Sequence, residues 1–589
     1  MERFIDTEKF VKLIESSVVQ VYQFTIGLRF QYLARFTDLE LMLVGLLGFL
    51  FVYWAKNKVS DFWTLTKRRG LIRLMLMLPF TGGFVDQCEK SHSQFRQSLP
   101  KTMHEPLKAI PKEGWSKAQI IARLNDFQKE EKSQVEDPKV SGVVFTSRAD
   151  IQEIAAIACT KFLYTNIMYY AKTGPSRQLE NEVIQFTRDM LNGTPEMTGL
   201  TTSGGSESIF LSMLAHKRHF LRERGISKPN VVLSETAHMA FRKACEYQEI
   251  EMKIVNVDRK TLANTPEQFE AAIDSNTICI VCSVPNYPYG TIDPIEEMSE
   301  MAGKYNVGFH IDGCMGSYLL PFVEYHGIKT GHKHVDLRIP NVTAYSIDTH
   351  KYGLTAKGSA VVIFPNKEIS KALYFGSTDW IGGIYGTTMI AGSRTSALIA
   401  SAWAVMVSIG YEGYAHHAKN IFDATEEYVG LLRKLDKYVR VVGNPKLGNV
   451  TTVSNNPKID MYKLGTLMNQ KGWYFMSGMS VPSLMFTITD KNIGMMASNA
   501  RDLETSINEL LENQNIELGG FFKIAHDISK YPGWITSKVL ADSLQELYEV
   551  GSLEHTDEHK IMIQEKMAAQ VEAAKKNGLA SPEATMSKK

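Results

Sequence analysis

Residues 277–312 read TICIVCSVPNYPYGTIDPIEEMSEMAGKYNVGFHID. This stretch opens with a short apolar run, continues from Pro294 with a segment of helical spacing, and ends with a second apolar run that closes on Asp312. A strand, a helix and another strand in this order predict a parallel strand pair joined by a crossover helix.

The same alternation continues on both sides of this stretch. The apolar runs VVLSE, KIVNV and AYSIDTHK alternate with helical patterns such as AFRKACEYQ. Strands that alternate with helices predict an α/β fold with a doubly wound, mostly parallel sheet, whose ligands bind at the carboxyl ends of the strands. Beyond about residue 400 the order becomes helix, strand, strand, helix, which predicts a smaller α+β domain.

The chain of 589 residues is longer than a single hydrophobic core usually supports, so we expect several parts. One of them, a helical linker, contains PKEGWSKAQIIARLNDFQKEEK, which predicts an amphipathic helix capped by Ser116. The expected parts are an N-terminal segment at 1–65, the helical linker at 66–150, a large domain at 151–400, a small C-terminal domain at 401–551, and a charged, disordered tail at 552–589.

An apolar run near the N-terminus predicts a membrane-spanning helix. Residues 39–55 read LELMLVGLLGFLFVYWA and are apolar except for Glu40. The run is short for a span, which needs roughly 17 to 25 residues, so a buried or interfacial helix is the alternative. Basic residues follow it, beginning with Lys56 and Lys58, so the positive-inside rule places the large C-terminal part in the cytosol. Without a small-residue cleavage site, the run fits an uncleaved anchor.

The bulk composition limits the kinds of partner. A formal net charge of +1 provides no overall field that would attract nucleic acid, so any anionic ligand must be held by a local site. The six cysteines lack the spacing of a disulfide framework, and Cys279 and Cys282 lie inside an apolar run. We expect buried thiols in a reducing compartment, and no metal site.

The first feature that carries chemistry is a glycine-rich turn. Residues 201–208 read TTSGGSES and precede a helical pattern. Gly204 and Gly205 would let the backbone approach an anion, and the start of the helix, with Ser206, would offer N–H groups and a positive dipole end to a phosphate. An ordinary loop is the alternative for this turn on its own.

Two further side chains are expected at the carboxyl ends of strands. His238 follows the run VVLSE at a helix start, where an imidazole can stack on a pyridine ring, although a helix cap or a core histidine would look the same. Asp312 ends the run VGFHID, where a carboxylate can keep a pyridine nitrogen protonated, with a cap or an ion pair as the alternative. His310 lies on the same face and would support Asp312 or pack in the core.

The fourth feature is Lys351 in SIDTHKYG. A lysine amine can form a Schiff base with an aldehyde, and we expect burial and cationic neighbours to lower its pKa. Thr349 and His350 would donate to a phosphate. A glycine turn, a stacking histidine, a strand-end aspartate and a lysine in this order predict pyridoxal 5'-phosphate bound to Lys351, and the aspartate-aminotransferase-like fold type I.

These motifs also carry a resemblance. The strings that carry it occur in order over roughly residues 114–551 and are VSGVVF, TTSGGSESI, TAHMAFRKA, CSVPNYPYGTIDPI, FHIDGCMGS, SIDTHKYGLTAKGSA and DWIGGIYGTTMIAGSR. The chain resembles the sphingosine-1-phosphate lyase family, a relative of the group II decarboxylases. The pair THKYG and AKGS is specific to that family and its nearest relatives, and the preceding membrane span matches as well.

The resemblance implies an activity and a setting. It implies a pyridoxal 5'-phosphate-dependent aldehyde-lyase that cleaves phosphorylated sphingoid bases between C2 and C3 into a long-chain aldehyde and phosphoethanolamine. It further implies a homodimer in the endoplasmic reticulum membrane with its catalytic domain facing the cytosol. By position, catalytic roles fall to His238, Asp312, Lys351 and Lys357, and substrate contacts to Phe145, Tyr169, Lys357, Tyr385, Ser393 and Arg394.

Two substrate positions depart from the family pattern. Phe145 stands where the family has a tyrosine, and Tyr169 where it has a histidine, and both family residues look like contacts to the substrate phosphate. Losing a hydroxyl and an imidazole there predicts weaker anion binding. Two alternatives therefore stay open: an amino-acid decarboxylase that uses the same cofactor site, and a weakly active lyase paralogue with a binding role.

Overall fold

The computed structural model describes residues 107, 109–169 and 171–530. The predicted membrane segment at 39–55 and the predicted tail at 552–589 lie outside these residues. In the described part of the chain, no helix combines the length and the apolar character needed to cross a bilayer.

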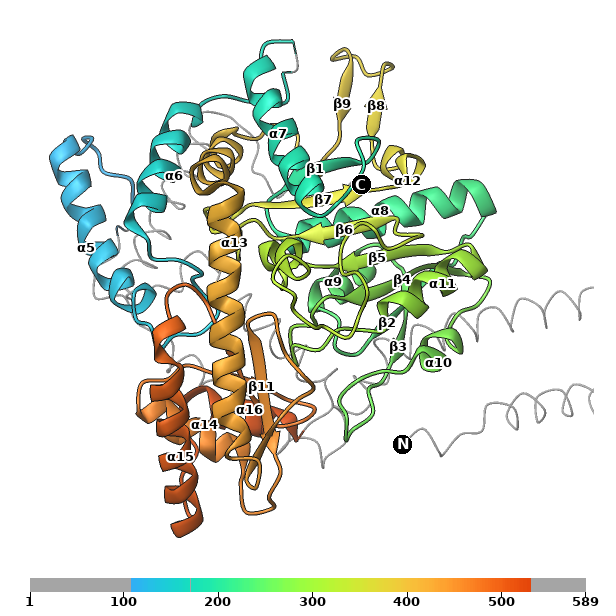
Figure 1. Cartoon of the computed structure of the whole chain (residues 1–589). Coiled ribbons are helices and arrows are strands. Elements are labelled where there is room, and N and C mark those ends of the chain that lie inside the picture. The colour runs from blue at the N-terminus through green and yellow to red at the C-terminus, as the bar shows by residue number, and fades with distance from the viewer. Residues whose placement is uncertain (1–106, 108, 170, 531–589) are drawn as a thin grey trace, which may run out of the picture. The chain divides into compact units, whose positions relative to one another are not determined.

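The centre of the fold is a seven-stranded sheet in the order β1-β7-β6-β5-β4-β2-β3 (Figure 1). The neighbours from β6 to β3 run parallel, whereas β7 runs antiparallel to both β1 and β6. The strands are β1 (Thr198–Thr202), β2 (Asn230–Ser234), β3 (Glu251–Val255), β4 (Thr277–Ser283), β5 (Gly308–Asp312), β6 (Ala344–Ile347) and β7 (Ala360–Phe364). The predicted mostly parallel sheet is confirmed.

Helices cover both faces of this sheet. On one face, apolar side chains of α8 and α9, such as Met213 and Phe241, pack on Val231 and Leu233 of β2. On the other face, α7 and α11 pack on the alternate residues of the strands, in a large core that also includes part of α13. These helices are α7 (Gly174–Met190), α8 (Gly205–Arg224), α9 (Met239–Tyr247), α11 (Ile295–Tyr305) and α13 (Ala397–Arg433), and the short α10 (Pro266–Glu270), α12 (Lys367–Lys371) and η2 (Ser317–Phe322) lie between strands.

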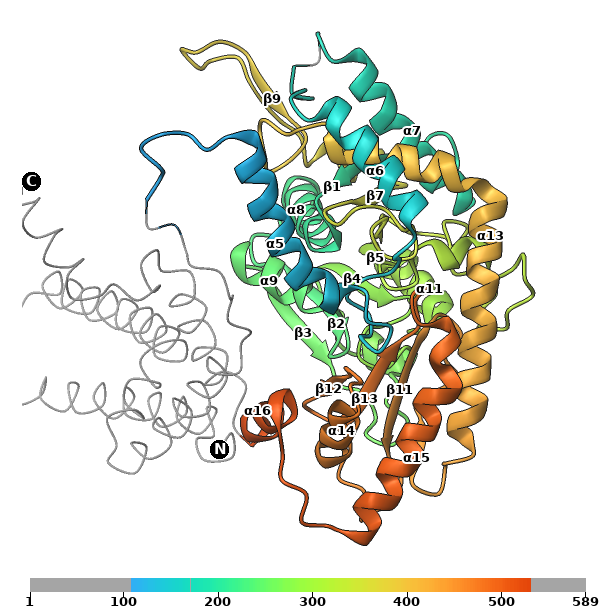
Figure 2. The ribbon, with the colours of Figure 1, turned by 90° about the vertical axis from the view of Figure 1, so that its left-hand side faces the viewer.

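A second, four-stranded antiparallel sheet forms the C-terminal part of the described chain, in the order β10-β11-β13-β12. The long helix α13 leads to it and bends at Gly410, whose φ of 67° is non-helical (Figure 2). The elements are β10 (Val439–Val441), β11 (Asn449–Ser454), α14 (Met461–Gln470), β12 (Met476–Gly478), β13 (Ser483–Thr487), η3 (Ile493–Met495), α15 (Met496–Glu512) and α16 (Gly520–Ser529). Helices and strands mix in this part, as predicted.

Besides α7, two described helices precede the central sheet in the chain. The predicted amphipathic helix is α5 (Lys117–Val135), and Ser116 caps it: the Gln119 N–H donates to Ser116 Oγ at 3.4 Å, and the Gln119 side chain accepts from the Ser116 N–H at 2.9 Å. After it comes α6 (Ala149–Phe162), which packs along α13. The antiparallel pair β8 (Phe375–Ser377) and β9 (Tyr385–Thr387) forms a hairpin that projects from the molecule (Figure 1).

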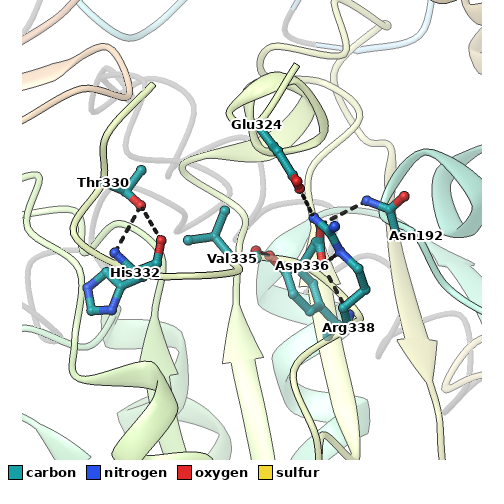
Figure 3. Close-up of polar contacts among 8 residues, drawn as sticks. Asn192, Glu324, Thr330, His332, Val335, Asp336 and Arg338 are labelled. Atoms are coloured by element: carbon teal, nitrogen blue, oxygen red, sulfur yellow. Dashed lines mark hydrogen bonds and ion pairs between the residues drawn. The ribbon is translucent and has the colours of Figure 1, made fainter. Parts of the chain in front are cut away.

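An ion-pair cluster holds the long connection between η2 and β6 (Figure 3). The Arg338 guanidinium donates to Asp336 at 2.6 Å and to Glu324 at 2.6 Å, and the Asn192 amide donates to Asp336 at 2.9 Å. Asp336 is only 2% exposed, so these donors take the place of water around its side chain. Because β6 leads directly to Lys351, this cluster supports the segment that carries the predicted cofactor lysine.

Candidate active site

The predicted cofactor residues gather around one cavity of about 330 Å³ at the carboxyl ends of β4, β5 and β6. Its wall includes Gly204, Gly205, Ser206, His238, Asp312, His350 and Lys351. The sheet explains this convergence, because parallel neighbours end on the same edge. These residues are spread over nearly 150 positions of the sequence, which is roughly the length of one domain. The fold brings them together.

The glycine turn lies against this cavity at the start of α8. Gly204 has a φ of 148°, and a Cβ on it would come within 3.2 Å of the His350 ring. A Cβ on Gly205 would come within 2.7 Å of Cys314 Sγ and 2.8 Å of Asp348 Oδ1. Only glycine fits here, and the first N–H groups of a 20-residue helix remain near the cavity wall as an anion site.

His238, at the start of α9, and Asp312, at the end of β5, both line the cavity. His238 caps α9, because its Nδ1 accepts from the Ala240 N–H at 3.2 Å, so the capping alternative is true as well. Burial lowers the pKa of His238, against the opposing charge of Asp312. Asp312 is 7% exposed, and its Oδ1 accepts from the Cys314 N–H at 3.1 Å. A neutral ring and a carboxylate thus face one space.

Lys351 lies beside a carboxylate that the sequence interpretation missed. Its Nζ is 3.0 Å from Asp348 Oδ2, and His350 Nε2 is 3.6 Å from the same oxygen. Burial by itself lowers the pKa of Lys351, but the charge of Asp348 and further anionic groups raise it above its ordinary value. The expectation of a lowered pKa is therefore wrong for the side chains present, because the nearest charge is negative.

Other residues of the wall were also missed. Cys314, Tyr287 and Asp348 line the cavity. Asp348 could have been found by the rule that identified Asp312, since it follows the last residue of a buried strand. Thr349, which was predicted to donate to a phosphate, does not line this cavity. Its hydroxyl donates instead to Ser359 Oγ at 2.6 Å and so stabilises the turn.

A buried polar chain ties together the elements that form the cavity. His310 of β5 bonds through Nδ1 to Ser212 Oγ of α8 at 2.7 Å and through Nε2 to Ser346 Oγ of β6 at 2.8 Å. A second histidine, His216 of α8, bonds to Thr343 Oγ1 at 2.7 Å. Burial lowers the pKa of His310 to about 3, so the ring is neutral. His310 therefore positions the helix and strands around the cavity rather than contacting Asp312.

A second cavity, of about 370 Å³, adjoins the first through His350. Its wall is mostly apolar and includes Phe145, Ile151 and Lys357. Lys357 Nζ lies 4.9 Å from the centre of the Phe145 ring and donates to the His350 carbonyl at 3.1 Å. Burial, with the nearby charge of Lys351, lowers the pKa of Lys357 to about 8. Two predicted substrate residues thus share one pocket.

Two other predicted substrate residues lie elsewhere in the described chain. Arg394 is held by Glu180, to which its guanidinium donates, and by Thr201 Oγ1 at 2.9 Å. It lines a separate cavity of about 200 Å³. Ser393 accepts a hydrogen bond from the Asn166 amide at 2.9 Å. The structure of one chain does not bring these side chains to Lys351.

The remaining two predicted substrate residues also lie outside the wall of the cavity around Lys351. Tyr385 belongs to the projecting hairpin, where its ring packs edge-on with Phe375 and Trp380 at centroid distances of 6.2 and 6.3 Å. Tyr169 is 66% exposed and lines neither of the two adjoining cavities. Within one chain, the histidine position of the family pattern is therefore not beside Phe145.

The residues around the first cavity fit pyridoxal 5'-phosphate. The start of α8, where Gly205 leaves no room for a side chain, suits the phosphate group, and Asp312 and Lys351 suit the ring nitrogen and the aldehyde. Asp348 Oδ1 is buried without a hydrogen-bond partner, as expected of an oxygen that faces a ligand site. The five described cysteines form no disulfide, and Cys279 and Cys282 are fully buried, as predicted.

Comparison with known proteins identifies the class to which this fold and site belong. The model of the pyridoxal-dependent decarboxylase conserved domain matches residues 100–452. The chain is therefore a pyridoxal 5'-phosphate-dependent enzyme of this class.

Within the class, the similarity is to one group. The chain is 32% identical over 526 residues to sphingosine-1-phosphate lyase 1 of Rattus norvegicus, which covers 87% of this chain and 90% of the relative. It is 30% identical over 548 residues to sphingosine-1-phosphate lyase of Saccharomyces cerevisiae, with 86% and 90% covered. The chain belongs to the sphingosine-1-phosphate lyase family.

Solved structures agree with this assignment. The sphingosine-1-phosphate lyase of Burkholderia pseudomallei superposes with a TM-score of 0.69 at 27% identity, over 76% of this chain and 98% of the other. A glutamate decarboxylase of Lactobacillus brevis, at 20% identity and a TM-score of 0.59 over 70% and 96% of the two chains, shares the fold.

Proposed function

We propose that this chain cleaves phosphorylated sphingoid bases between C2 and C3 and releases a long-chain aldehyde and phosphoethanolamine. The observation that carries the proposal is the pair of adjoining cavities: a polar one around Lys351 and a mostly apolar one that contains Lys357. An amphiphilic substrate with an amine, an anionic group and an alkyl chain needs both kinds of wall. The names of the relatives point to the same substrate class.

The side chains of the first cavity divide the work. When bound, pyridoxal 5'-phosphate supplies an aldehyde that captures an amine and a ring that withdraws electrons from the breaking bond. Lys351 provides the amine that holds the cofactor between turnovers. Asp312 holds a proton on the ring nitrogen, and the neutral His238 ring covers one side of the cavity. When Lys357 is protonated, its ammonium group binds the substrate phosphate.

Incubation of the purified full chain with dihydrosphingosine 1-phosphate tests the proposal. Formation of a long-chain aldehyde together with phosphoethanolamine supports it. The decarboxylase alternative is tested in parallel by incubating the protein with aromatic and acidic amino acids and measuring the carbon dioxide released. Binding of the phosphorylated base without any cleavage would favour the weakly active paralogue.

We also propose that the chain works as a homodimer in which Tyr385, Ser393 and Arg394 contribute to the partner's site. Support comes from the hairpin β8–β9, whose tip exposes Trp380 by 57% and Ile381 by 102%. Large apolar side chains that are exposed in a single chain are typical of a surface that a partner chain covers. Light scattering of the purified protein measures the mass of the assembly, and a monomer would contradict the proposal.

The proposed location is the endoplasmic reticulum membrane, with a single span and the catalytic part in the cytosol. Support comes from the apolar run at 39–55 and the basic residues that follow it. Protease treatment of sealed microsomes should digest the catalytic part. Protection of that part from protease would contradict the orientation.

A further inference from the structure

Asp348 is a buried carboxylate with a one-sided environment. It follows β6, and its side chain is 4% exposed. Its Oδ2 lies 3.0 Å from Lys351 Nζ and 3.6 Å from His350 Nε2. The other oxygen, Oδ1, has no hydrogen-bond partner and faces the start of α8, where a Cβ on Gly205 would come within 2.8 Å of it. Lys351 is therefore the cation that balances this carboxylate.

Other titratable groups also surround Lys351. They are His238, Tyr287, Asp312, Cys314, His350 and Lys357. Burial raises the pKa of Cys314 and of Tyr287, so both are neutral near pH 7. Burial also lowers the pKa of His238 and of His350, which favours the neutral rings. The charged neighbours that remain are Asp348, Asp312 and Lys357, and Asp348 forms the ion pair.

We propose that Asp348 holds the proton on Lys351 and so sets the pH range in which this lysine can bond to the cofactor. The ammonium group must lose a proton before its nitrogen can attack an aldehyde. That proton leaves Lys351 Nζ for a base in solution, because the lowered pKa of Asp348 makes its carboxylate the weaker base of the pair. The nitrogen then forms a C=N bond with the aldehyde carbon, and the two hydrogens left on nitrogen leave with the carbonyl oxygen as water.

This inference rests on Lys351 being the cofactor lysine, which sodium borohydride reduction of the wild-type protein tests separately. The full chain, freed of cofactor, is mixed with excess pyridoxal 5'-phosphate between pH 6.5 and 10, and the rise of the bound chromophore is followed by absorbance. Because the raised pKa of Lys351 lies above this range, the wild-type rate should still be rising with pH throughout it. Removing the charge in Asp348→Asn should move the rate–pH curve down by about one pH unit or more, which is a roughly tenfold faster attachment at each pH below the midpoint. Asp348→Glu keeps the charge and should keep a curve near that of the wild type.

Asp293→Asn serves as the matched control. Asp293 is an equally buried carboxyl whose Oδ2 accepts from the Ser283 N–H at 2.8 Å, an acceptor role that asparagine retains. Its rate–pH curve should coincide with that of the wild type. An unchanged or slower attachment in Asp348→Asn, with the cofactor trapped on Lys351, overturns the role of Asp348 alone. Trapping on another lysine overturns the cofactor assignment as well.

A second measurement needs no variant. Acetic anhydride labels only neutral amines, and the pH at which labelling of a lysine reaches half its maximum does not depend on how exposed the lysine is. In the cofactor-free wild type, Lys357 should reach its midpoint near pH 8, and Lys351 should reach its own at a clearly higher pH. A midpoint for Lys351 at or below that of Lys357 overturns the inference.

Discussion

Lys357 should make the rate of substrate cleavage depend on pH, and one substitution at this position should shift that pH dependence. Its ammonium group sits over the Phe145 ring at 4.9 Å and donates to the His350 carbonyl at 3.1 Å. Burial and the charge of Lys351 lower its pKa to about 8. Below that pH the side chain is positive and can bind the substrate phosphate, and above it the charge is lost.

The magnitude follows from the one interaction that disappears. A hydrogen bond from a charged donor to a buried anion contributes about 1.5 to 3 kcal/mol, which is roughly 10- to 150-fold in kcat/KM. We therefore expect kcat/KM for dihydrosphingosine 1-phosphate to fall by this factor as pH rises through about 8. Lys357→Met should show the low value at every pH, and Lys357→Arg should keep the high value to a higher pH, since guanidinium does not titrate there.

The assay measures aldehyde formation between pH 7 and 9.5, with the cofactor absorbance recorded at each pH as a control for cofactor loss. Unfolding caused by Lys357 cannot imitate the effect. Its folded-state pKa is below its unfolded value, so the unfolded chain binds more protons in between, and the stability contribution of this group rises with pH through that window. An Lys357→Arg profile that falls at the same pH as the wild type would refute the reasoning.

Three further predictions concern the cofactor, the substrate and the fold. Sodium borohydride should fix the cofactor to Lys351, and Lys351→Ala should abolish this fixation; mass spectrometry of the labelled peptide decides, and a label on another lysine counts against the assignment. Phe145→Tyr should strengthen binding of the phosphorylated base by about 1 to 3 kcal/mol, or roughly 5- to 150-fold, with the visible spectrum unchanged. A KM that does not fall would mean that the phosphate binds elsewhere. Arg338→Ala should lower the free energy of unfolding by about 2 to 4 kcal/mol, because it leaves the buried Asp336 with only Asn192 and a backbone N–H as donors; denaturant titration measures it, and a loss below about 1 kcal/mol would show that the cluster in Figure 3 is weak.

The alternation of apolar runs with helical spacing was sufficient to predict the central sheet. Each run of β2, β4 and β5 is buried along its whole length, and such runs can hardly form anything but inner strands of a covered sheet. The gathering of the candidate cofactor residues at one cavity was predictable for a related reason. Gly204 precedes a helix, Asp312 ends a strand and Lys351 lies in the turn that follows one, and a parallel sheet brings such positions to one edge.

The C-terminal four-stranded sheet was harder to predict in detail. Its strands β10 and β12 are three residues long, which is too short for a period to be recognised. The boundary expected at residue 400 falls inside α13, which continues from one sheet toward the other with a bend at Gly410. No local sequence pattern marks a helix that packs in two layers, because its buried face changes along its length.

The sequence by itself determined which chemistry this protein can perform, because the glycine turn, the strand-end aspartate and the lysine are local features with local rules. Tertiary structure alone decided which side chains share a space. It paired Lys351 with Asp348, which reversed the expected direction of the lysine's pKa shift, and it placed Lys357 over Phe145. It also left Tyr169 outside the two adjoining cavities around Lys351 and Lys357. Distances between residues far apart in sequence depend on how layers pack, and electrostatic effects follow those distances.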